Sequence, residues 1–383
     1  MSGLASQSSQ GVRAIAFHLP QFHPIPENDE WWGKGFTEWT NVVRARPLFQ
    51  GHYQPHLPAD LGFYDLRLSE AREAQAELAR TYGISGFCYY HYWFQGRRLL
   101  GRPVDEILKS SRPDFPFCLC WANESWTRGW LGQERDVLIS QTYDPYDDLQ
   151  HCRWLAKAFA DHRYLRVKRR AVFLIYRPGH LPEPKRLTDT LRDACIKNGD
   201  ENPYLIGVDA HAPGRDFRSD GFDTTLGFEP QLGALPSAFY DAFSRRRVLR
   251  NLRLGVMSGR LKLYDYTEAR DRILTLERPF PTVPCVFVSW DNSPRRGEKG
   301  VIIVNASPQA FGRALEASVS KLRSRSDDES LLFINAWNEW AEGNHLEPCQ
   351  KWGRGYLEAT RRALTIFANG ASESQSLVAR TSL

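Results

Sequence analysis

The chain has 383 residues and a formal net charge of +5, and 13% of its residues are aromatic, including 12 tryptophans. The charge is modest for this length and comes from dispersed lysines and arginines, which argues against a nucleic-acid-binding protein. The length suits either two domains or one barrel-sized domain with insertions.

The start of the chain is polar. Residues 1–10 contain no basic segment followed by an apolar one, and no apolar run approaches membrane-spanning length. The seven cysteines are an odd number without zinc-type spacing, and four lie in strand-like apolar runs. The sequence therefore predicts a soluble cytoplasmic protein with reduced cysteines, no signal peptide and no transmembrane segment. Peripheral attachment to a membrane assembly stays open.

Short apolar runs recur along the chain and are typical of buried parallel strands. In chain order they are Arg13–His18, Ile84–His91, Phe115–Trp121, Ala171–Tyr176, Tyr204–Asp209, Phe222–Phe228, Pro284–Trp290 and Leu331–Trp337. Each ends in polar, charged or aromatic residues.

Helical patterns follow most of these runs. Apolar residues from Leu68 to Tyr82 recur at helical spacing and stop at Gly83, and Asp144-Pro145 and Ser307-Pro308 each combine a capping residue with a proline at the first helical position. Eight strands alternating with helices predict an α/β fold of the (β/α)8 TIM-barrel type, with its active site at the C-terminal ends of the strands.

Two connections are unusually long. The first, Leu19 to Leu66, is rich in aromatic residues, glycine and proline, and we expect a structured lid over the barrel mouth rather than a helix. The second, from Pro230 to about Phe280, is expected to form an elaboration beside the barrel. We therefore expect a disordered N-terminus at 1–12, a single catalytic barrel domain at 13–369 and a disordered tail at 370–383.

Glu339 and Glu342 lie three positions apart directly after the last apolar run. Glycoside chemistry usually needs two carboxyl groups, one that donates a proton to the leaving oxygen and one that acts as base or nucleophile. Two close carboxyls resist joint ionisation, which keeps one of them protonated. The alternative is a capping pair at the start of the last helix, but the flanking tryptophans, asparagine and histidine favour the catalytic interpretation.

Other strand ends carry further candidates. Glu124 is a candidate third carboxylate or sugar ligand, or else a loop residue that pairs with Arg128. Arg295 and Arg296 suit bidentate contact with a carboxylate or phosphate, as in an anionic sugar or a nucleotide-sugar diphosphate, or else belong to a solvated turn. The spacing of the histidines matches no zinc signature, so no metal and no other cofactor is predicted.

The candidate substrate-binding residues are grouped at these predicted strand ends and in the lid. They are His18, Trp39, His91, Tyr92, Trp93, Trp121, Asn123, Glu124, Trp290, Asp291, Arg295, Arg296, Trp337, Asn338 and His345.

Several blocks resemble the WbsX-like family, which is named for glycosyltransferases of lipopolysaccharide and capsule assembly and is related to glycoside hydrolase family 99. They are Leu19–Asn28, Gly33–Val42, Gly86–Phe94, Cys120–Glu124, Trp290–Arg296 and Asn335–Gly343. The resemblance implies a (β/α)8 barrel and retaining hydrolysis of α-mannosidic linkages through a 1,2-anhydrosugar. It implies that Glu339 is the base for the sugar's 2-hydroxyl and Glu342 the acid/base at the leaving oxygen. The segment around Trp39 follows the WbsX-like pattern rather than the endomannosidase one.

The sequence thus predicts a carbohydrate-active enzyme that acts on a glycosidic bond of an oligosaccharide or polysaccharide with Glu339 and Glu342. Hydrolysis is slightly favoured because no nucleotide-binding loop is visible. The alternatives are a glycosyltransferase of lipopolysaccharide, O-antigen or capsule biosynthesis that uses a nucleotide sugar, and a non-catalytic glycan-binding barrel. A structural role in a polysaccharide-synthesis complex is a further hypothesis.

Overall fold

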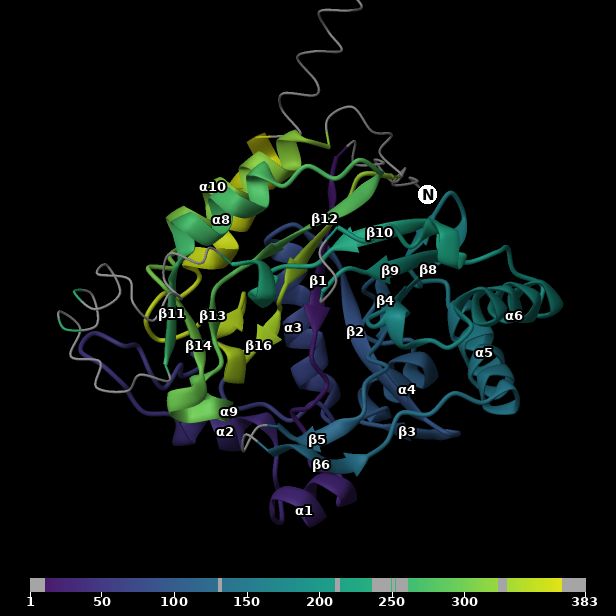
Figure 1. Cartoon of the computed structure of the whole chain (residues 1–383), viewed down its shortest axis with the longest axis horizontal. Coiled ribbons are helices and arrows are strands. Elements are labelled where there is room, and N and C mark those ends of the chain that lie inside the picture. The colour runs from purple at the N-terminus through teal and green to yellow at the C-terminus, as the bar shows by residue number, and fades with distance from the viewer. Residues whose placement is uncertain are drawn as a thin grey trace, which may run out of the picture.

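The computed structural model describes residues 11–129, 133–210, 214–235, 261–322 and 329–366, and the single positions 249 and 252. Eight parallel strands form a closed barrel (Figure 1). They are β1 (Arg13–His18), β2 (Ile84–Phe94), β4 (Phe117–Trp121), β8 (Arg170–Ile175), β9 (Tyr204–Val208), β10 (Thr224–Gly227), β12 (Thr282–Phe287) and β15 (Leu331–Asn335). Neighbours pair in this order, and β15 returns to β1. The predicted TIM barrel is confirmed.

The helices pack around the barrel. In chain order they include α3 (Ser69–Thr81), α4 (Arg102–Ser110), α5 (Pro145–Phe159), α6 (Pro184–Lys197), α8 (Tyr266–Thr275), α10 (Pro308–Ser320) and a last helix at 355–366. The predicted caps form, because the Asp144 carboxylate accepts from the backbone N–H groups of Tyr146 and Asp147 and the Ser307 hydroxyl accepts from that of Ala310. These contacts explain why both helices begin where the sequence predicts.

Short elements gather at the C-terminal end of the barrel, in the lower part of Figure 1. They include α1 (Pro26–Trp32), α2 (Glu38–Arg44), β5 (Trp126–Arg128), β6 (Gln133–Ile139) and α9 (Ser293–Arg296). The expectation that the first connection contains no helix was wrong. Pro26 opens α1, acidic residues stand in its first turn, and Thr37 and Thr40 form a capping box at the start of α2.

A small sheet lies beside the barrel, and the second long connection contributes one of its strands. Strand β11 (Lys262–Asp265) pairs in parallel with β14 (Val301–Val304), which pairs in antiparallel fashion with β13 (Trp290–Asp291). Two further short strands pair in antiparallel fashion with barrel strands. Strand β3 (Arg97–Leu99) pairs with β2, and β7 (Arg166–Val167) pairs with β8. Much of 236–260 lies outside the described residues. Residues 1–10 and 367–383 also lie outside them, and most of the two ends that we predict to be disordered falls there.

All seven cysteines are free and buried, as the sequence predicts for core residues. In the described part of the chain, every helix is too short or too polar to cross a bilayer.

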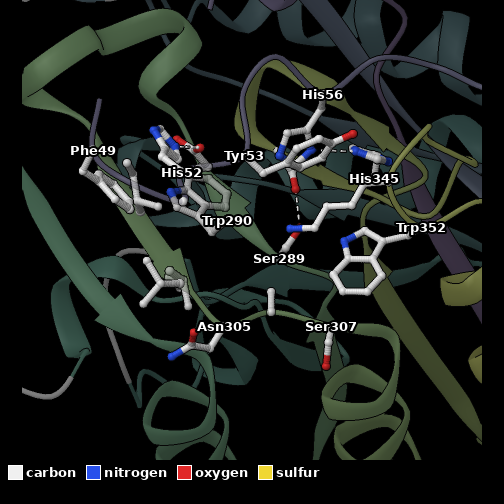
Figure 2. A pocket seen from close by; sticks show the side chains of 18 of the residues that line it. Phe49, His52, Tyr53, His56, Ser289, Trp290, Asn305, Ser307, His345 and Trp352 are labelled. Atoms are coloured by element: carbon white, nitrogen blue, oxygen red, sulfur yellow. Dashed lines mark hydrogen bonds and ion pairs between the residues drawn. The ribbon is translucent and has the colours of Figure 1, made fainter. Parts of the chain in front are cut away.

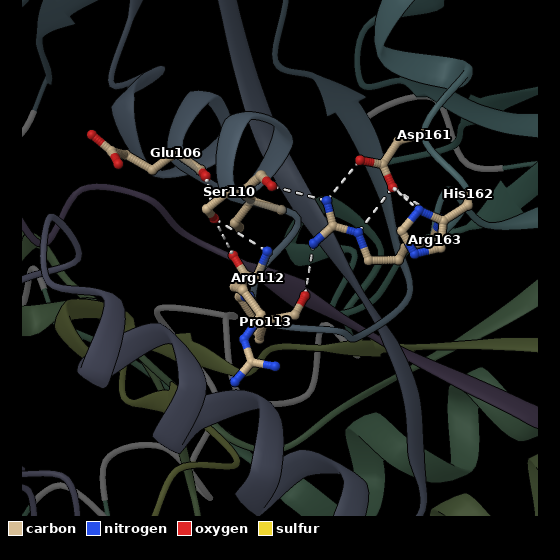
Figure 3. A network of polar contacts seen from close by, with 8 residues as sticks. Glu106, Ser110, Arg112, Pro113, Asp161, His162 and Arg163 are labelled. Carbon is tan, nitrogen blue, oxygen red and sulfur yellow. Dashed lines mark hydrogen bonds and ion pairs between the residues drawn. The ribbon is translucent and has the colours of Figure 1, made fainter.

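A buried arginine links segments at the N-terminal end of the barrel by hydrogen bonds. The Arg163 guanidinium donates to the carbonyl oxygens of Pro113 at 2.8 Å and Ile107 at 2.9 Å and to Asp161 Oδ2 at 2.6 Å (Figure 3). Its side chain is 2% exposed. These contacts join α4 and the segment that follows it to the segment after α5, at the N-terminal end of the barrel strands.

Replacing Arg163 by alanine is expected to lower the free energy of unfolding by about 3–5 kcal/mol, because the largely buried Asp161 carboxylate loses its charged partner and two carbonyl groups each lose a hydrogen bond. Arg112→Ala is the matched control, since this neighbouring side chain is 65% exposed and forms only a loose ion pair with Glu73. Urea denaturation measures both variants. Equal midpoints would show that the Arg163 network contributes nothing to stability.

Candidate active site

The last barrel strand leads into a tight turn that carries two glutamates. Strand β16 (Asn338–Glu339) pairs with β17 (Asn344–His345), and a single 3-10 turn over Trp340–Glu342 connects them. Gly343 closes the turn at φ 57°, where a Cβ atom would lie only 3.0 Å from Asp291 Cβ. The turn therefore requires glycine at this position, and it brings Glu339 and Glu342 to the wall of one cavity.

Arg295 joins these glutamates to a third carboxylate. This residue lies on α9, and its Nη1 donates to Glu342 Oε1 at 2.7 Å while Nη2 donates to Glu339 Oε2 at 3.2 Å. Its Nε and Nη2 also donate to Glu38 Oε2, at 3.1 Å and 2.9 Å. Glu38 begins α2 and its side chain is fully buried. The first long connection therefore supplies charge to the site as well as covering it.

Burial raises the pKa of both glutamates. At Glu339 the charges of Glu342 and Glu38 raise the pKa further, and Arg295 opposes them. At Glu342 the strongest opposing influence is Arg295, whereas Glu38 adds to the rise. Because three carboxylates share one guanidinium in a buried place, the Glu339–Glu342 pair can hold one proton near neutral pH. Such a pair can both donate and accept a proton.

The cavity beside the pair has a volume of about 510 Å³. Aromatic side chains form much of its wall, namely Trp32, Tyr90, Tyr92, Trp126, Tyr176, Phe228 and Trp290. Polar side chains, including Gln21 and Asn335, stand between them. Flat apolar rings interspersed with a few polar groups suit the apolar faces and hydroxyls of a pyranose.

Glu124 also lines this cavity, and its partner differs from the one considered in the sequence. Its Oε1 accepts from Arg177 Nε at 2.6 Å, whereas Arg128 pairs with Asp136 at 2.8 Å. Arg177 follows β8, so the ion pair joins the ends of two adjacent barrel strands. The Glu124 side chain remains 35% exposed, which leaves it accessible to a ligand in the cavity.

The cavity contains part of the predicted site. Its lining includes Tyr92, Glu124, Trp290, Arg295, Arg296, Glu339 and Glu342. The other predicted residues lie outside this lining: His18, Trp39, His91, Trp93, Trp121, Asn123, Asp291, Trp337, Asn338 and His345.

Strand alternation explains the residues of β2. Successive side chains of a strand point to opposite faces, so Tyr90 and Tyr92 line the cavity while the residues between and after them face α5. His91 stacks on Trp154 of α5 with ring centroids 4.9 Å apart, and Trp93 Nε1 donates to Asp147. The structure therefore gives His91 and Trp93 a packing role between barrel and helix.

Three more of the predicted residues form structural contacts with a neighbouring helix or loop. His18 Nε2 lies 3.2 Å from Gln75 Oε1 of α3, so it too faces a helix. Trp121 packs edge to face on His151 of α5. Asn123 is buried and bonds both the backbone N–H and the carbonyl of Arg177, which fixes the loop that carries Glu124.

The remaining outlying residues support the glutamate turn or line a different cavity. Asn338 Oδ1 accepts from the Leu19 backbone N–H at 2.7 Å, and Trp337 packs on Phe87. Trp39 of α2 packs on Trp340 inside the turn. Asp291 and His345 line a second cavity, described below.

Several site residues were not predicted. Glu38 contacts Arg295 directly, and Tyr90 and Tyr176 line the cavity. Tyr90 could have been predicted, because it lies two positions before Tyr92 and therefore on the same face of a strand. Tyr176 directly follows the apolar run of β8. Glu38 had no comparable pattern, since it lies in a long irregular connection.

No metal site was predicted, and among the residues that the structure describes no group of three or more His, Cys, Asp or Glu side chains is arranged to hold a metal ion.

A further buried carboxylate, Glu347, supports the turn from behind. Its Oε2 accepts from Trp340 Nε1 at 2.6 Å and from the Tyr64 hydroxyl at 2.8 Å, and its Oε1 accepts from Gln75 Nε2 at 2.7 Å. Burial raises the pKa of Glu347 to about 7, although these three hydrogen bonds lower it. Since Trp340 stands between Glu339 and Glu342, Glu347 fixes the turn that presents them.

Replacing Glu347 by alanine is expected to lower the free energy of unfolding by roughly 3–5 kcal/mol, because three buried donors lose their acceptor at about 1–3 kcal/mol each, partly offset by relaxation. Chemical denaturation is the measurement, with the exposed Glu358→Ala as the control. If both variants unfold at the wild-type midpoint, Glu347 does not hold the turn.

Comparisons with known proteins show the family and the fold of the chain. A family model described as Glycosyltransferase WbsX matches residues 14–360. The chain belongs to the WbsX family. This WbsX-family chain is 44% identical over 361 residues, 94% of its length, to an uncharacterized protein WxcX of Xanthomonas campestris pv. campestris (strain B100). The match covers 50% of that protein, so the chain spans about half the length of the curated relatives it matches.

Solved structures with the same fold include a glycoside hydrolase and a glycoside hydrolase-like protein. Two of them are structures of a GH99 endo-alpha-mannosidase from Bacteroides thetaiotaomicron, which is 13% identical to the WbsX-family chain. Their TM-scores are 0.54 and 0.53, and the matches cover 94% and 93% of this chain and 98% of the mannosidase. Another is a glycoside hydrolase-like protein, with TM-score 0.57 and 12% identity over 95% of this chain and 97% of that one. At such identities the likeness shows the fold alone.

Proposed function

We propose that this protein is a carbohydrate-active enzyme that breaks a glycosidic bond with the pair Glu339 and Glu342. The observation that carries the proposal is the position of a buried and a largely buried carboxyl, both with raised pKa values, in an aromatic cavity at the C-terminal ends of the barrel strands. Active sites of barrel enzymes lie at this end. Protonation of a leaving oxygen requires a carboxyl group that stays protonated near neutral pH.

The roles within the pair can be assigned in two ways. The family resemblance makes Glu339 the base for the sugar's 2-hydroxyl and Glu342 the proton donor. The geometry of the free protein favours the opposite location of the proton, because the Arg295 guanidinium donates to Glu342 at 2.7 Å but to Glu339 at only 3.2 Å and so stabilises the charged form of Glu342 more. Substrate binding changes the partners of both carboxyls, so we propose the pair as the catalytic unit and assign its members by the kinetics described in the Discussion.

Hydrolysis is the first candidate reaction, and glycosyl transfer is the second. The family description as a glycosyltransferase favours transfer, which would place the protein in lipopolysaccharide, O-antigen or capsule synthesis with a nucleotide sugar as donor. The geometry of Arg295 favours hydrolysis. Its donors are directed to Glu38, Glu339 and Glu342, so its guanidinium is committed to carboxylates rather than available for a diphosphate.

The two reactions give products of different mass. The protein is incubated with oligosaccharides containing mannose, rhamnose or uronate residues, with and without nucleotide sugars, and the products are analysed by mass spectrometry. Hydrolysis yields shorter glycans without any nucleotide sugar, whereas transfer yields elongated glycans only when a nucleotide sugar is present. Calorimetric binding without any product would instead identify a glycan-binding barrel and contradict the proposal.

A further inference from the structure

A second, larger cavity of about 800 Å³ lies beside the candidate active site. Three segments surround it: 49–56 of the first long connection, 289–307 after β12, and 343–356 after β15 (Figure 2). Trp290 lines both cavities, so the two share one wall. Loops after the seventh and eighth strands of barrel enzymes frequently bind phosphate groups.

The walls of this cavity present aromatic rings and one lysine. Phe49, Tyr53 and Trp352 lie around the cavity in Figure 2. Lys351 is exposed, and its Nζ lies 4.6 Å from the Tyr53 ring centroid and 4.9 Å from that of Trp352. The two rings hold the ammonium group at the cavity while it remains accessible. The lining therefore offers stacking surfaces next to a positive charge.

Asp291 is the acidic side chain of the lining, and it is buried. The buried Asp291 carboxylate is occupied, because its Oδ2 lies 2.7 Å from His52 Nε2 and accepts from Gln54 Nε2 at 2.6 Å. His56 and His345 contact each other through ring nitrogens 3.0 Å apart. Burial lowers the pKa of His56 to about 4 and the pKa of His345 well below its usual range, so both are neutral at pH 7.

The floor of the cavity adds to the positive potential. Ser307 lines it and caps α10, a helix of 13 residues, whose positive dipole end therefore faces this side. Asn305 and Ser307 offer polar groups at the same level of the cavity (Figure 2). Lys351 and the helix end together favour an anionic ligand.

We propose that this cavity is a second saccharide-binding site that takes a pyranose carrying an anionic substituent, either a carboxylate or a phosphate. The sugar ring stacks on Trp352 and Tyr53, and Lys351 pairs with the anion. The site is separate from the Glu339–Glu342 pair, and its occupancy is measured as binding. If no anionic sugar binds here, the proposed catalytic function is therefore unaffected. If the Glu339–Glu342 pair proves inactive, the proposed binding site is likewise unaffected.

Calorimetry with methyl glucuronoside, glucose 6-phosphate, methyl glucoside and inorganic phosphate tests this proposal on the whole chain. We expect at least one of the two anionic sugars to bind, and the one that binds identifies the carboxylate or the phosphate as the preferred group. Lys351→Ala and Trp352→Ala are each expected to weaken that binding about tenfold or more, the effect of losing one charge-assisted contact or one stacking face. Lys351→Arg is expected to preserve it, and added salt to weaken it.

Two control variants separate this cavity from other places on the chain. Lys109→Ala removes an exposed lysine of α4, and Trp126→Ala removes an aromatic ring from the other cavity. Both are expected to bind the anionic sugar as the wild type does. The proposal is overturned if Trp126→Ala abolishes binding while Trp352→Ala preserves it, if methyl glucoside or inorganic phosphate binds as tightly as the anionic sugars, or if no anionic sugar binds.

Discussion

Glu339→Gln and Glu342→Gln are each expected to lower the rate of glycosidic bond turnover by about 10²–10⁴-fold, the usual contribution of a positioned acid or base. Glutamine keeps the size and most hydrogen bonds of each side chain but cannot exchange a proton. Because both side chains lie at the cavity wall and already face Arg295, we expect the variants to fold normally. Circular dichroism and initial rates on the substrate found in the product screen measure the two properties separately.

The two variants also distinguish the acid from the base. A substrate with an activated leaving group, such as a dinitrophenyl glycoside, needs no protonation, so the variant of the acid regains most of its rate while the variant of the base does not. Rescue of Glu342→Gln would support the roles implied by the family resemblance, and rescue of Glu339→Gln would support the order favoured in the free protein. Glu358→Gln, at an exposed position, is the control that should behave as wild type.

Arg295→Met is expected to give the second large effect, a loss of about 3–5 kcal/mol in the free energy of unfolding, because it leaves two buried carboxyls and the largely buried Glu342 without their shared cation. The loss should be greater at pH 8 than at pH 5. Removing the cation raises the pKa values of Glu339 and Glu342 further, so protonation relieves the repulsion at low pH and the full penalty appears only once the pH exceeds those raised values.

The same variant should change the pH dependence of turnover. Since the cation lowers both pKa values in the wild type, the rate profile of Arg295→Met is expected to move to higher pH, with a lower rate at pH 7. Arg295→Lys keeps the charge but cannot reach three carboxyls at once, so it should shift the profile less. Arg112→Met, at an exposed position near the opposite end of the barrel, is the control. An unchanged profile in Arg295→Met would show that Arg295 does not set the protonation of the pair.

The barrel could be predicted from sequence because its strands are buried on both faces and appear as continuous apolar runs. The first run, Arg13–His18, coincides with β1 at both ends. The run Pro284–Trp290 proved to cover most of β12 and the start of β13, because the chain stays largely apolar through the bend between them. Periodicity alone therefore locates the elements better than it locates their ends.

The site was harder to predict than the fold. Residues next to one another at a strand end were predicted together, but alternate side chains point to opposite faces, so Tyr92 lines the cavity while His91 packs against α5. Glu38 illustrates the second difficulty. It meets Arg295 only because the first long connection folds across the barrel mouth, and an irregular connection has no periodic pattern from which to predict such a contact.

The most direct test of the central claim is the mass of the saccharide products formed by the wild type and by the double variant Glu339→Gln/Glu342→Gln from the same panel of glycans. We expect the wild type to convert at least one glycan and the folded double variant to bind that glycan without converting it. Conversion by the double variant at the wild-type rate, or binding without conversion by the wild type across the panel, would contradict the claim that this pair acts on a glycosidic bond.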